Sequence, residues 1–258
     1  MLVATISTIV VFGVAAWVIV NAPNWPLVQR TFFDADRFAS AWPKVVAGFL
    51  INLQIWVISA ALILVCALVL AILRSLDDPV FFPFRLFAIV YIDVFRGLPS
   101  IILIYLLGLG IPALGLPGVP SDVFFWGIVT LVLVWSAYVA EVYRAGIQSV
   151  HPSQAAAARS LGLSGVQTFR FVVLPQAIRR VIPPLLNDMI GLQKDTALLS
   201  FLGIVEAFRR AQIIASANFN FTPYLVSAVL FLLCTIPMAR FVDWLVARDR
   251  RRYLAGAR

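Results

Sequence analysis

Residues 149–200 read SVHPSQAAAARSLGLSGVQTFRFVVLPQAIRRVIPPLLNDMIGLQKDTALLS. This polar and basic stretch interrupts a chain that otherwise consists mostly of apolar segments. It predicts two short helices joined by a sharp turn, followed by an apolar helix that carries several polar residues. The apolar segments on both sides of it predict membrane helices, so the chain is organised around this interruption.

The first short helix is expected to begin at Pro152 and to stop at Gly162. Pro152 suits the first helical position because its missing N–H would have no partner there. Residues 154–160 are rich in alanine, which favours a helix, and Gly162 supplies the left-handed residue that ends one. The small alanine side chains allow a partner to approach closely, but they bury little apolar surface.

The second short helix is expected to begin at Gly165, because Ser164 and Gln167 match a capping box. It is expected to run until Pro175 disturbs it. His151, the single histidine of the chain, stands at the start of the first short helix and suits a cap or a contact better than a catalyst.

Composition places the chain among membrane proteins that cross the bilayer several times. Of the 258 residues, 62% are hydrophobic and 12% are charged, and the mean hydropathy is +0.98. We expect an all-α membrane protein with about six transmembrane helices of about 20 apolar residues each. The candidate spans are residues 2–20, 45–73, 86–110, 123–143, 181–204 and 223–246.

The first span could be a cleaved signal peptide or a retained helix. No Lys or Arg precedes it, it is longer than the apolar core of most signal peptides, and only a weak cleavage pattern follows it. These features favour a retained helix.

The net charge of +8 reflects membrane topology rather than nucleic-acid binding, because the arginines lie in the loops between spans. If the central stretch is cytoplasmic, most of the basic residues fall on its side of the membrane, and the positive-inside rule then places both termini in the cytoplasm. The opposite side receives only Arg30, Arg37, Lys44, Arg209 and Arg210.

Two pairs of opposite charges lie three residues apart near the ends of spans. Asp93 with Arg96, and Glu141 with Arg144, could each face one another on a single helix, which lowers the cost of charge near a membrane. Gly97 and Pro99 are expected to loosen the helix just beyond the first pair. These groups could form interfacial ion pairs at a kink, or a hinge or gate.

No constellation for covalent chemistry stands out in the sequence. We find no pairing of nucleophile and base, no paired catalytic carboxylates and no metal-ligand spacing. Cys66 and Cys234 lie in apolar spans and are expected to act as small hydrophobes. The chain also lacks the G-x-x-x-x-G-K-[ST] phosphate loop, so we expect no catalytic residue, no cofactor and no metal in it.

The central stretch resembles the membrane permease subunits of ATP-binding cassette importers, in their polar amino acid uptake branch (the histidine, glutamine, arginine, glutamate and opine permeases). The hallmark of the family is the pattern EAA, three residues, Gly, nine residues, an aliphatic residue, any residue and Leu-Pro. The similarity runs from about Gly48 to the C-terminus and excludes the first span. The matching residues are Ala137-Tyr138, Glu141, Arg144, Ile147, Ala157-Ala158, Gly162, Val172 to Ala177, Pro183 and Lys194-Asp195-Thr196, and Arg96-Gly97-Leu98-Pro99 is similar to the family's Arg-Gly-Thr-Pro.

Three positions depart from the family pattern. Ala156 stands where the family usually has glutamate, which removes any salt bridge from that position to a partner. Ser153 stands in place of a common glycine, and Leu98 in place of threonine.

The resemblance implies a type I importer permease: a five-helix core preceded by one extra N-terminal helix. It divides the chain into the extra helix and an external loop (1–44), the transmembrane domain (45–247) with its coupling loop at about 149–175, and a basic cytoplasmic tail (248–258). The first short helix would be the coupling helix, which docks on a separate ATPase. Its contacts would come from Pro152, Gln154, Ala156, Ala157, Ala158, Ser160, Leu161, Gly162 and Leu163.

The resemblance also implies the partners and the location. ATP and magnesium would be held by the partner ATPase subunits, and an extracytoplasmic solute-binding protein would deliver the cargo, a polar amino acid. A second permease subunit, identical or paralogous, would complete the path. The complex would lie in the inner (plasma) membrane of a bacterial cell, in contact with lipid, and no nucleic-acid partner is expected. An external patch of Glu206, Arg209 and Arg210 could meet the binding protein or simply be solvated.

Polar residues in two spans are candidates for the substrate path. The fifth span carries too many polar groups for a lipid-facing helix, as is typical of transport sites near the middle of a membrane. Alternatively, Asn52 could serve only helix packing, and Lys194 could lie between two permease subunits. The candidate path residues are Asn52, Asn187, Asp188, Gln193, Lys194 and Thr196.

The sequence is also compatible with a second class of function, ion-coupled secondary transport. In an ion-coupled secondary transporter, Asp93, Glu141 or Asp188 would carry a proton or another ion. Transport that follows an ion gradient without any ATPase would favour that class.

Overall fold

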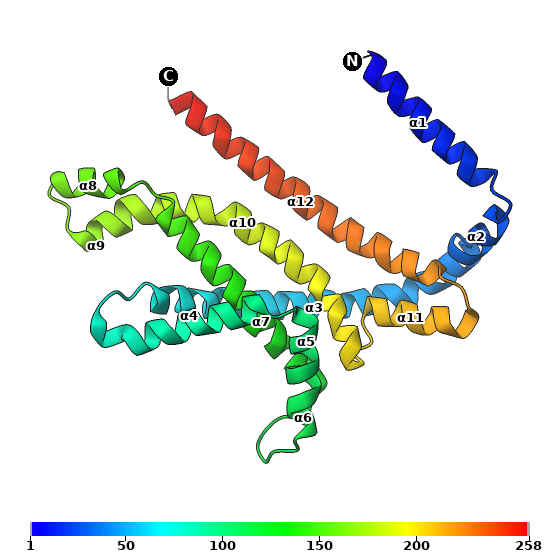
Figure 1. The fold of residues 1–258 in the computed structure, drawn as a ribbon, viewed down its shortest axis with the longest axis horizontal. Helices are drawn as coiled ribbons and strands as arrows, with labels where there is room; N and C mark the ends of the chain where they lie inside the picture. The colour runs from blue at the N-terminus through cyan, green and yellow to red at the C-terminus, as the bar shows by residue number, and fades with distance from the viewer. Residues whose placement is uncertain (1, 257–258) are drawn as a thin grey trace.

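The computed structural model describes residues 2–256, with side chains for residues 5–248; the last two residues of the expected basic tail lie outside this range. The described chain consists of helices joined by loops and contains no strand (Figure 1). Its elements in chain order are α1 (Leu2–Val20), α2 (Trp25–Phe32), α3 (Ala35–Arg74), η1 (Pro79–Phe81), α4 (Phe82–Gly97), α5 (Ser100–Tyr105), η2 (Leu106–Gly110), α6 (Ile111–Ala113), α7 (Val123–Gln148), α8 (Pro152–Ser160), α9 (Gly165–Thr168), η3 (Phe169–Val173), α10 (Leu174–Asp195), η4 (Thr196–Leu202), α11 (Ala207–Asn218) and α12 (Thr222–Gly256).

Within the described part of the chain, three helical segments are long and apolar enough to cross a membrane. They are Trp25–Arg74, Val123–Gln148 and Thr222–Arg248. A fourth span is possible if Pro79–Gly97 and Ser100–Ala113 count as one, although the two parts are bent by 105°. The third expected span, residues 86–110, lies within this bent pair. Gly97 ends α4 and Pro99 precedes a new helix, so the chain breaks where loosening was expected.

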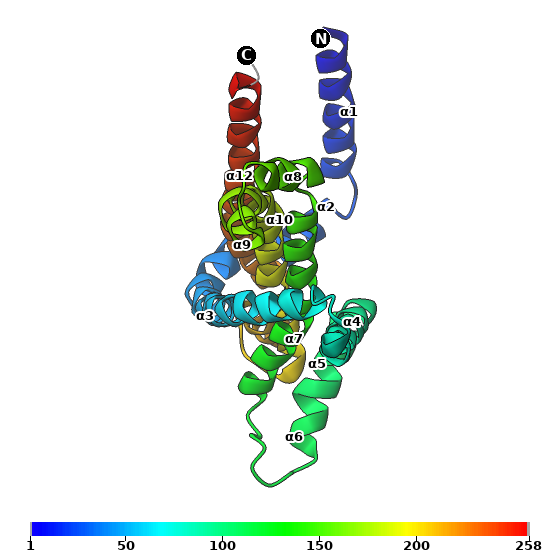
Figure 2. The ribbon, with the colours of Figure 1, turned by 90° about the vertical axis from the view of Figure 1, so that its left-hand side faces the viewer.

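The other two expected spans are helical but do not meet this criterion. α1 coincides with the first expected span and stands apart from the bundle (Figures 1 and 2), with apolar side chains such as Phe12 and Trp17 exposed. α10 covers most of the fifth expected span, and charged side chains at both of its ends reduce its apolar character. The expected boundaries at 44 and 248 both fall inside helices, in α3 and α12.

α3 is the central element, because both apolar cores of the bundle use it. Its second half packs with α4, α7 and α10 around Ile55, Ile63, Ile92, Leu131 and Leu192. Its first half packs with α11 and α12 around a smaller cluster that includes Val45, Ala207, Ala211 and Val226. The long α3 helix thereby holds α7 and α10 in a fixed relation to α11 and α12.

Gly48 sets the distance between α3 and the start of α11. A Cβ atom at this position would lie 2.7–2.9 Å from backbone atoms of Glu206 and Ala207, closer than real side chains come. We therefore expect Gly48→Ala to destabilise the chain by about 1–3 kcal/mol, because a backbone must shift to admit the methyl group. Thermal unfolding in detergent, followed by far-UV circular dichroism, measures this loss.

Gly13→Ala is the matched control, because Gly13 lies in α1 and a Cβ there would meet nothing within 4 Å. Its unfolding should match that of the native chain. Equal unfolding of the two variants would contradict the close approach of α3 to α11.

The central stretch folds largely as its helix-end signals predict. α8 begins at Pro152, and the His151 ring nitrogen Nδ1 accepts a hydrogen bond from the Ser153 N–H at 3.2 Å. Gly162 has the left-handed φ of 85°, and Ser164 and Gln167 form the expected capping box at the start of α9. The cap at His151, the turn and both helix starts are confirmed.

The second helix is disturbed before Pro175 but does not stop there. The chain stays helical from Gly165 to Asp195, passing through the wide π-helical turn η3 before α10 begins. Pro175 is the second residue of α10, directly after the change from π-helical to α-helical geometry. Pro183 and Pro184 also lie inside α10 without ending it.

Candidate functional site

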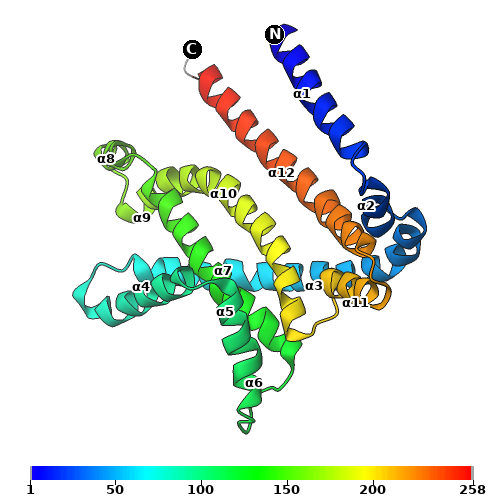
Figure 3. The ribbon, with the colours of Figure 1, turned by 45° about the vertical axis from the view of Figure 1, so that its right-hand side comes forward.

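α8 and α9 form a corner that projects from one end of the bundle (Figures 1 and 3). Most side chains of α8 are exposed, and Ala158 is the buried residue through which the helix packs. Leu161 and Val166 are apolar yet 85% and 77% exposed. Exposed apolar side chains beside an alanine-rich helix are typical of a protein interface. Leu161 belongs to the predicted coupling set, whereas Val166 carries no sequence signal that would have singled it out.

Two long-range hydrogen bonds hold this corner against α10. The Arg180 guanidinium donates to the Ser149 carbonyl oxygen at the α7–α8 junction. The Gln176 amide donates to the Gln154 side-chain oxygen at 3.5 Å. The corner is thus hydrogen-bonded to α10 at two points.

An arginine–glutamate–arginine cluster lies where α3 and α7 approach this corner. Glu141 accepts hydrogen bonds from Arg144 on its own helix and from Arg74 at the end of α3. The Glu141 side chain is only 14% exposed. The predicted Glu141–Arg144 pair is confirmed, but sequence spacing could not reveal Arg74, which comes from another helix.

The predicted pair of Asp93 and Arg96 is wrong: no ion pair between described side chains joins them. The Arg96 guanidinium instead lies over the Tyr138 ring, 5.4 Å from its centroid. α4 packs on α7, so Arg96 finds an aromatic partner on the neighbouring helix.

A buried polar cluster joins α3, η4 and α11. The Asn52 amide nitrogen donates to Thr196 Oγ1 and to Glu206 Oε2, each at 3.0 Å, and its oxygen accepts from the Ala207 N–H at 3.0 Å. Asn52, Thr196 and Glu206 are fully buried. Glu206 also caps α11, because it accepts from the N–H groups of Phe208 and Arg209.

This cluster corrects the expected external patch, since Glu206 is buried and satisfied rather than exposed beside Arg209 and Arg210. It also supplies Asn52 and Thr196 with hydrogen-bond partners inside the protein. The helix-packing alternative for Asn52 therefore has a direct structural basis.

Asn52→Leu is expected to destabilise the chain by about 2–4 kcal/mol, because a buried carboxylate loses a donor and the Ala207 N–H loses its acceptor. The measurement is the unfolding temperature in detergent. Gln54→Leu is the control, because Gln54 is an exposed amide two residues along the same helix. A cluster without structural importance would give the two variants the same unfolding temperature.

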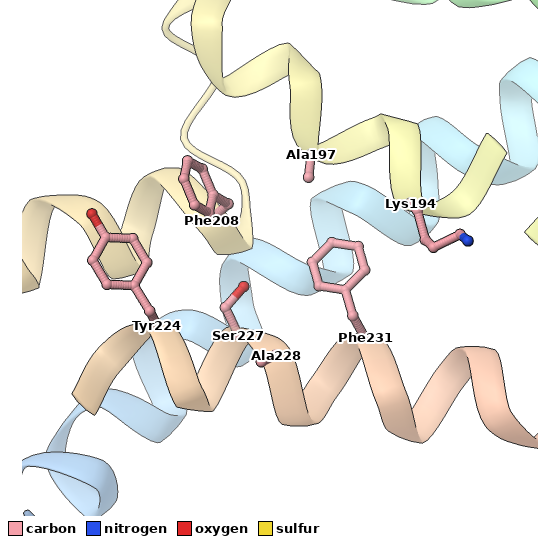
Figure 4. Close-up of a pocket in the computed structure, with 7 residues that line it drawn as sticks. All are labelled: Lys194, Ala197, Phe208, Tyr224, Ser227, Ala228 and Phe231. Carbon is pink, nitrogen blue, oxygen red and sulfur yellow. The ribbon is translucent and has the colours of Figure 1, made fainter. Parts of the chain in front are cut away.

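A hollow of about 390 Å³ lies between α10–η4, the start of α11 and the first half of α12 (Figure 4). Lys194 stands at one end, and the rings of Phe208 and Tyr224 stand at the other, with Phe231 between them. No acidic residue lines it. Its lining residues are Lys194, Ala197, Phe208, Tyr224, Ser227, Ala228 and Phe231.

A second hollow, of about 350 Å³, adjoins the first and shares Phe208 with it. It lies between α5, η4 and α11, and Arg209 and Gln212 supply its long polar side chains. Its lining residues are Tyr105, Ser200, Phe201, Leu202, Gly203, Phe208, Arg209 and Gln212. We call these two spaces the Lys194 hollow and the Arg209 hollow.

The structure separates the residues predicted for the substrate path. Of the predicted set, only Lys194 lines the Lys194 hollow, whereas Asn52 and Thr196 lie in the buried cluster. Asn187 is exposed on α10. The Oδ2 atom of Asp188 and both amide atoms of Gln193 are buried without a hydrogen-bond partner. The aromatic lining from α11 and α12 was missed, because apolar spans carry no signal for which rings face a cavity.

In the part of the chain that the structure describes, no group of three or more His, Cys, Asp or Glu side chains could hold a metal ion. Cys66 is exposed and Cys234 half-buried, and both thiols are free. The geometry offers a projecting corner, a bundle and two hollows.

A protein family described as the inner membrane component of binding-protein-dependent transport systems matches residues 80–251. The chain belongs to this family. The match takes in the bent α4–α5 pair, the projecting corner and both hollows, so these are parts of a transport permease. The similarity first noticed in the central stretch is confirmed, and it favours the importer over the ion-coupled secondary transporter.

Individual relatives agree with this assignment. An L-cystine transport system permease protein of Bacillus subtilis is 35% identical, and the match covers 77% of this chain and 84% of the relative. An arginine transport system permease protein of the same bacterium is 32% identical over 80% of this chain and 92% of its own length. A crystal structure of an amino acid ABC transporter with histidines superposes with a TM-score of 0.76 at 31% identity, covering 83% of this permease and 98% of that chain.

Proposed function

We propose that this chain is the permease subunit of an ATP-driven amino acid importer in a bacterial inner membrane, with α8 as the helix that couples it to a separate ATPase. One observation carries the proposal: α8 is an exposed, alanine-rich helix at a projecting corner of a chain that belongs to the permease family. The named cargoes of the relatives support an amino acid as the substrate.

The geometry of α8 suits the transmission of force. Pro152 and Gly162 define both ends of the helix, and the hydrogen bond between Gln176 and Gln154 ties it to α10. α10 then runs without a break from Leu174 to Asp195, beside the Lys194 hollow. ATP-driven closure of two ATPases would move α8, and α10 would carry that movement to the transport path.

The partners follow from this role. ATP and magnesium would bind to the ATPase subunits, a solute-binding protein would deliver the cargo outside the cell, and a second permease, identical or paralogous, would complete the path. Both ends of the described chain lie on the same side of the molecule as α8 (Figures 1 and 3), which supports cytoplasmic termini. The ion-coupled alternative loses one of its candidate carriers, because two arginines already neutralise Glu141.

ATP-dependent uptake of radiolabelled amino acids tests the proposal. Proteoliposomes would contain this permease with its ATPase and binding protein, and ATP would be supplied on the ATPase side. We expect accumulation that stops when the ATPase carries an inactivating substitution. Uptake that follows an imposed ion gradient and ignores ATP would overturn the proposal.

A further inference from the structure

The Lys194 and Arg209 hollows each have one cation and no acidic residue in their lining. Asp195, next to Lys194 in the chain, and Glu206, which accepts from the Arg209 N–H, lie outside both linings. Lys194 is the single charged residue among those that line its hollow, and Arg209 is the single charged residue among those that line the other. No ion pair between described side chains includes either residue. The Arg209 guanidinium donates to the neutral oxygen of Gln212 at 2.5 Å.

We propose that the two hollows form a positively charged route that selects an amino acid with net negative charge, such as glutamate. This inference rests on the proposed function and names the cargo class of the same path. Lys194 and Arg209 are its specificity-determining residues.

The apolar walls strengthen the effect of the two charges. Phe208, Tyr224 and Phe231 exclude water from one side of the Lys194 hollow, and a charge acts more strongly where the surroundings are less polar. A cation in such surroundings is costly unless an anion joins it. A second carboxylate on the cargo supplies that anion, whereas a cationic side chain would meet one like charge in each lining and no acidic lining residue.

The two hollows adjoin at Phe208, which lines both of them. A carboxylate that moves from Arg209 to Lys194 would have to pass this side chain. An uncharged amino acid such as glutamine has the same size as glutamate but gains less from either cation.

The test compares glutamate with glutamine, which differ in charge and barely in shape. Isothermal titration would measure the binding of each to the purified permease–ATPase complex without a binding protein, so that the selectivity of the binding protein does not enter. We expect the native complex to prefer glutamate by about tenfold or more, the effect of one charge-assisted hydrogen bond. The preference should shrink as salt is raised, because the charges are screened.

Lys194→Gln and Arg209→Gln should each reduce the ratio of glutamate to glutamine affinity, and Lys194→Arg should retain it. Arg210→Gln is the matched control, because Arg210 lies on the same helix, is exposed and lines neither hollow. Unfolding temperatures equal to that of the native complex would show that the variants are folded.

The outcomes separate this inference from the proposed function. ATP-dependent uptake of amino acids with no glutamate preference, or with a preference that Lys194→Gln and Arg209→Gln leave unchanged, would overturn the charged route alone. A native complex that binds arginine more tightly than glutamate would overturn it as well. Absence of ATP-dependent uptake for every amino acid would overturn the proposed function.

Discussion

Gly162→Pro is expected to reduce ATP-dependent uptake by at least about tenfold while the permease remains folded in the membrane. Gly162 has φ of 85°, whereas proline holds φ near −65°. Proline also removes the hydrogen bond from the Gly162 N–H to the Arg159 carbonyl oxygen at 3.0 Å. Leu161 has ψ of 10°, a conformation that a following proline disfavours. The backbone between α8 and α9 must then adopt another conformation, which changes the orientation of α8 relative to α10.

Gly165→Pro is the matched control for this experiment. Gly165 is the first residue of α9, where proline is favoured, and Ser164 before it is already extended with ψ of 164°. A Cβ atom at Gly165 would come no closer than 3.5 Å to a neighbour, the Arg159 guanidinium. Uptake by this variant should match native uptake, measured in proteoliposomes with equal amounts of inserted permease.

The pair of variants makes the result decisive. If both prolines abolish uptake, the corner tolerates no proline at either position. The left-handed geometry of residue 162 is then not the specific cause of the lost uptake. If both permit uptake, the turn at Gly162 does not transmit the action of the ATPase, and the coupling role proposed for α8 is wrong.

Glu141→Gln is expected to lower the free energy of unfolding by about 3 kcal/mol. The substitution preserves shape but leaves Arg74 and Arg144 facing each other at the ends of α3 and α7 without their anion. The cost is large because the carboxylate is only 14% exposed, so water cannot replace it. Denaturant or thermal unfolding in detergent measures the loss.

Asp243→Asn is the control, because Asp243 pairs with Arg240 at the same three-residue spacing but both side chains are more than two-thirds exposed, at 68% and 79%. An exposed pair of this kind contributes little, so the control should unfold like the native chain. The double variant Arg74→Gln with Glu141→Gln should recover part of the loss, since one of the two unpaired arginines is gone. Equal unfolding of Glu141→Gln and Asp243→Asn would contradict the structural role of the cluster.

Local chemistry made the projecting corner predictable from sequence. Pro152, Gly162 and the Ser164–Gln167 capping box each act over three or four residues, so their effects could be inferred without tertiary contacts. The all-helical membrane fold followed from composition in the same way. The break at Gly97 and Pro99 was anticipated as a loosening, but its 105° angle depends on how α5 packs against α7 and η4.

Contacts between distant parts of the chain were not predictable. Arg74 joins Glu141 across 67 residues, and Asn52 joins Glu206 across 154 residues. Nothing in the spacing of either partner points to the other, because the contact exists only once α3 has packed against α7 and α11. The same reason explains why the predicted path residues divide between a cavity wall and a buried cluster. How deeply a residue lies in the protein and which way its side chain points both depend on tertiary packing.

The π-helical turn η3 has a consequence for the orientation of the corner. Each residue of an α-helix turns the chain by about 100° about the helix axis. A π-helical turn holds one more residue than an α-helical turn over a similar rise, so η3 takes up one extra residue between α9 and α10. Removing one residue from Phe169–Val173 would let this turn relax to α-helical geometry and would leave the orientation of α8 nearly unchanged, whereas removing one residue from the regular part of α10 would rotate α8 by about 100° about that axis.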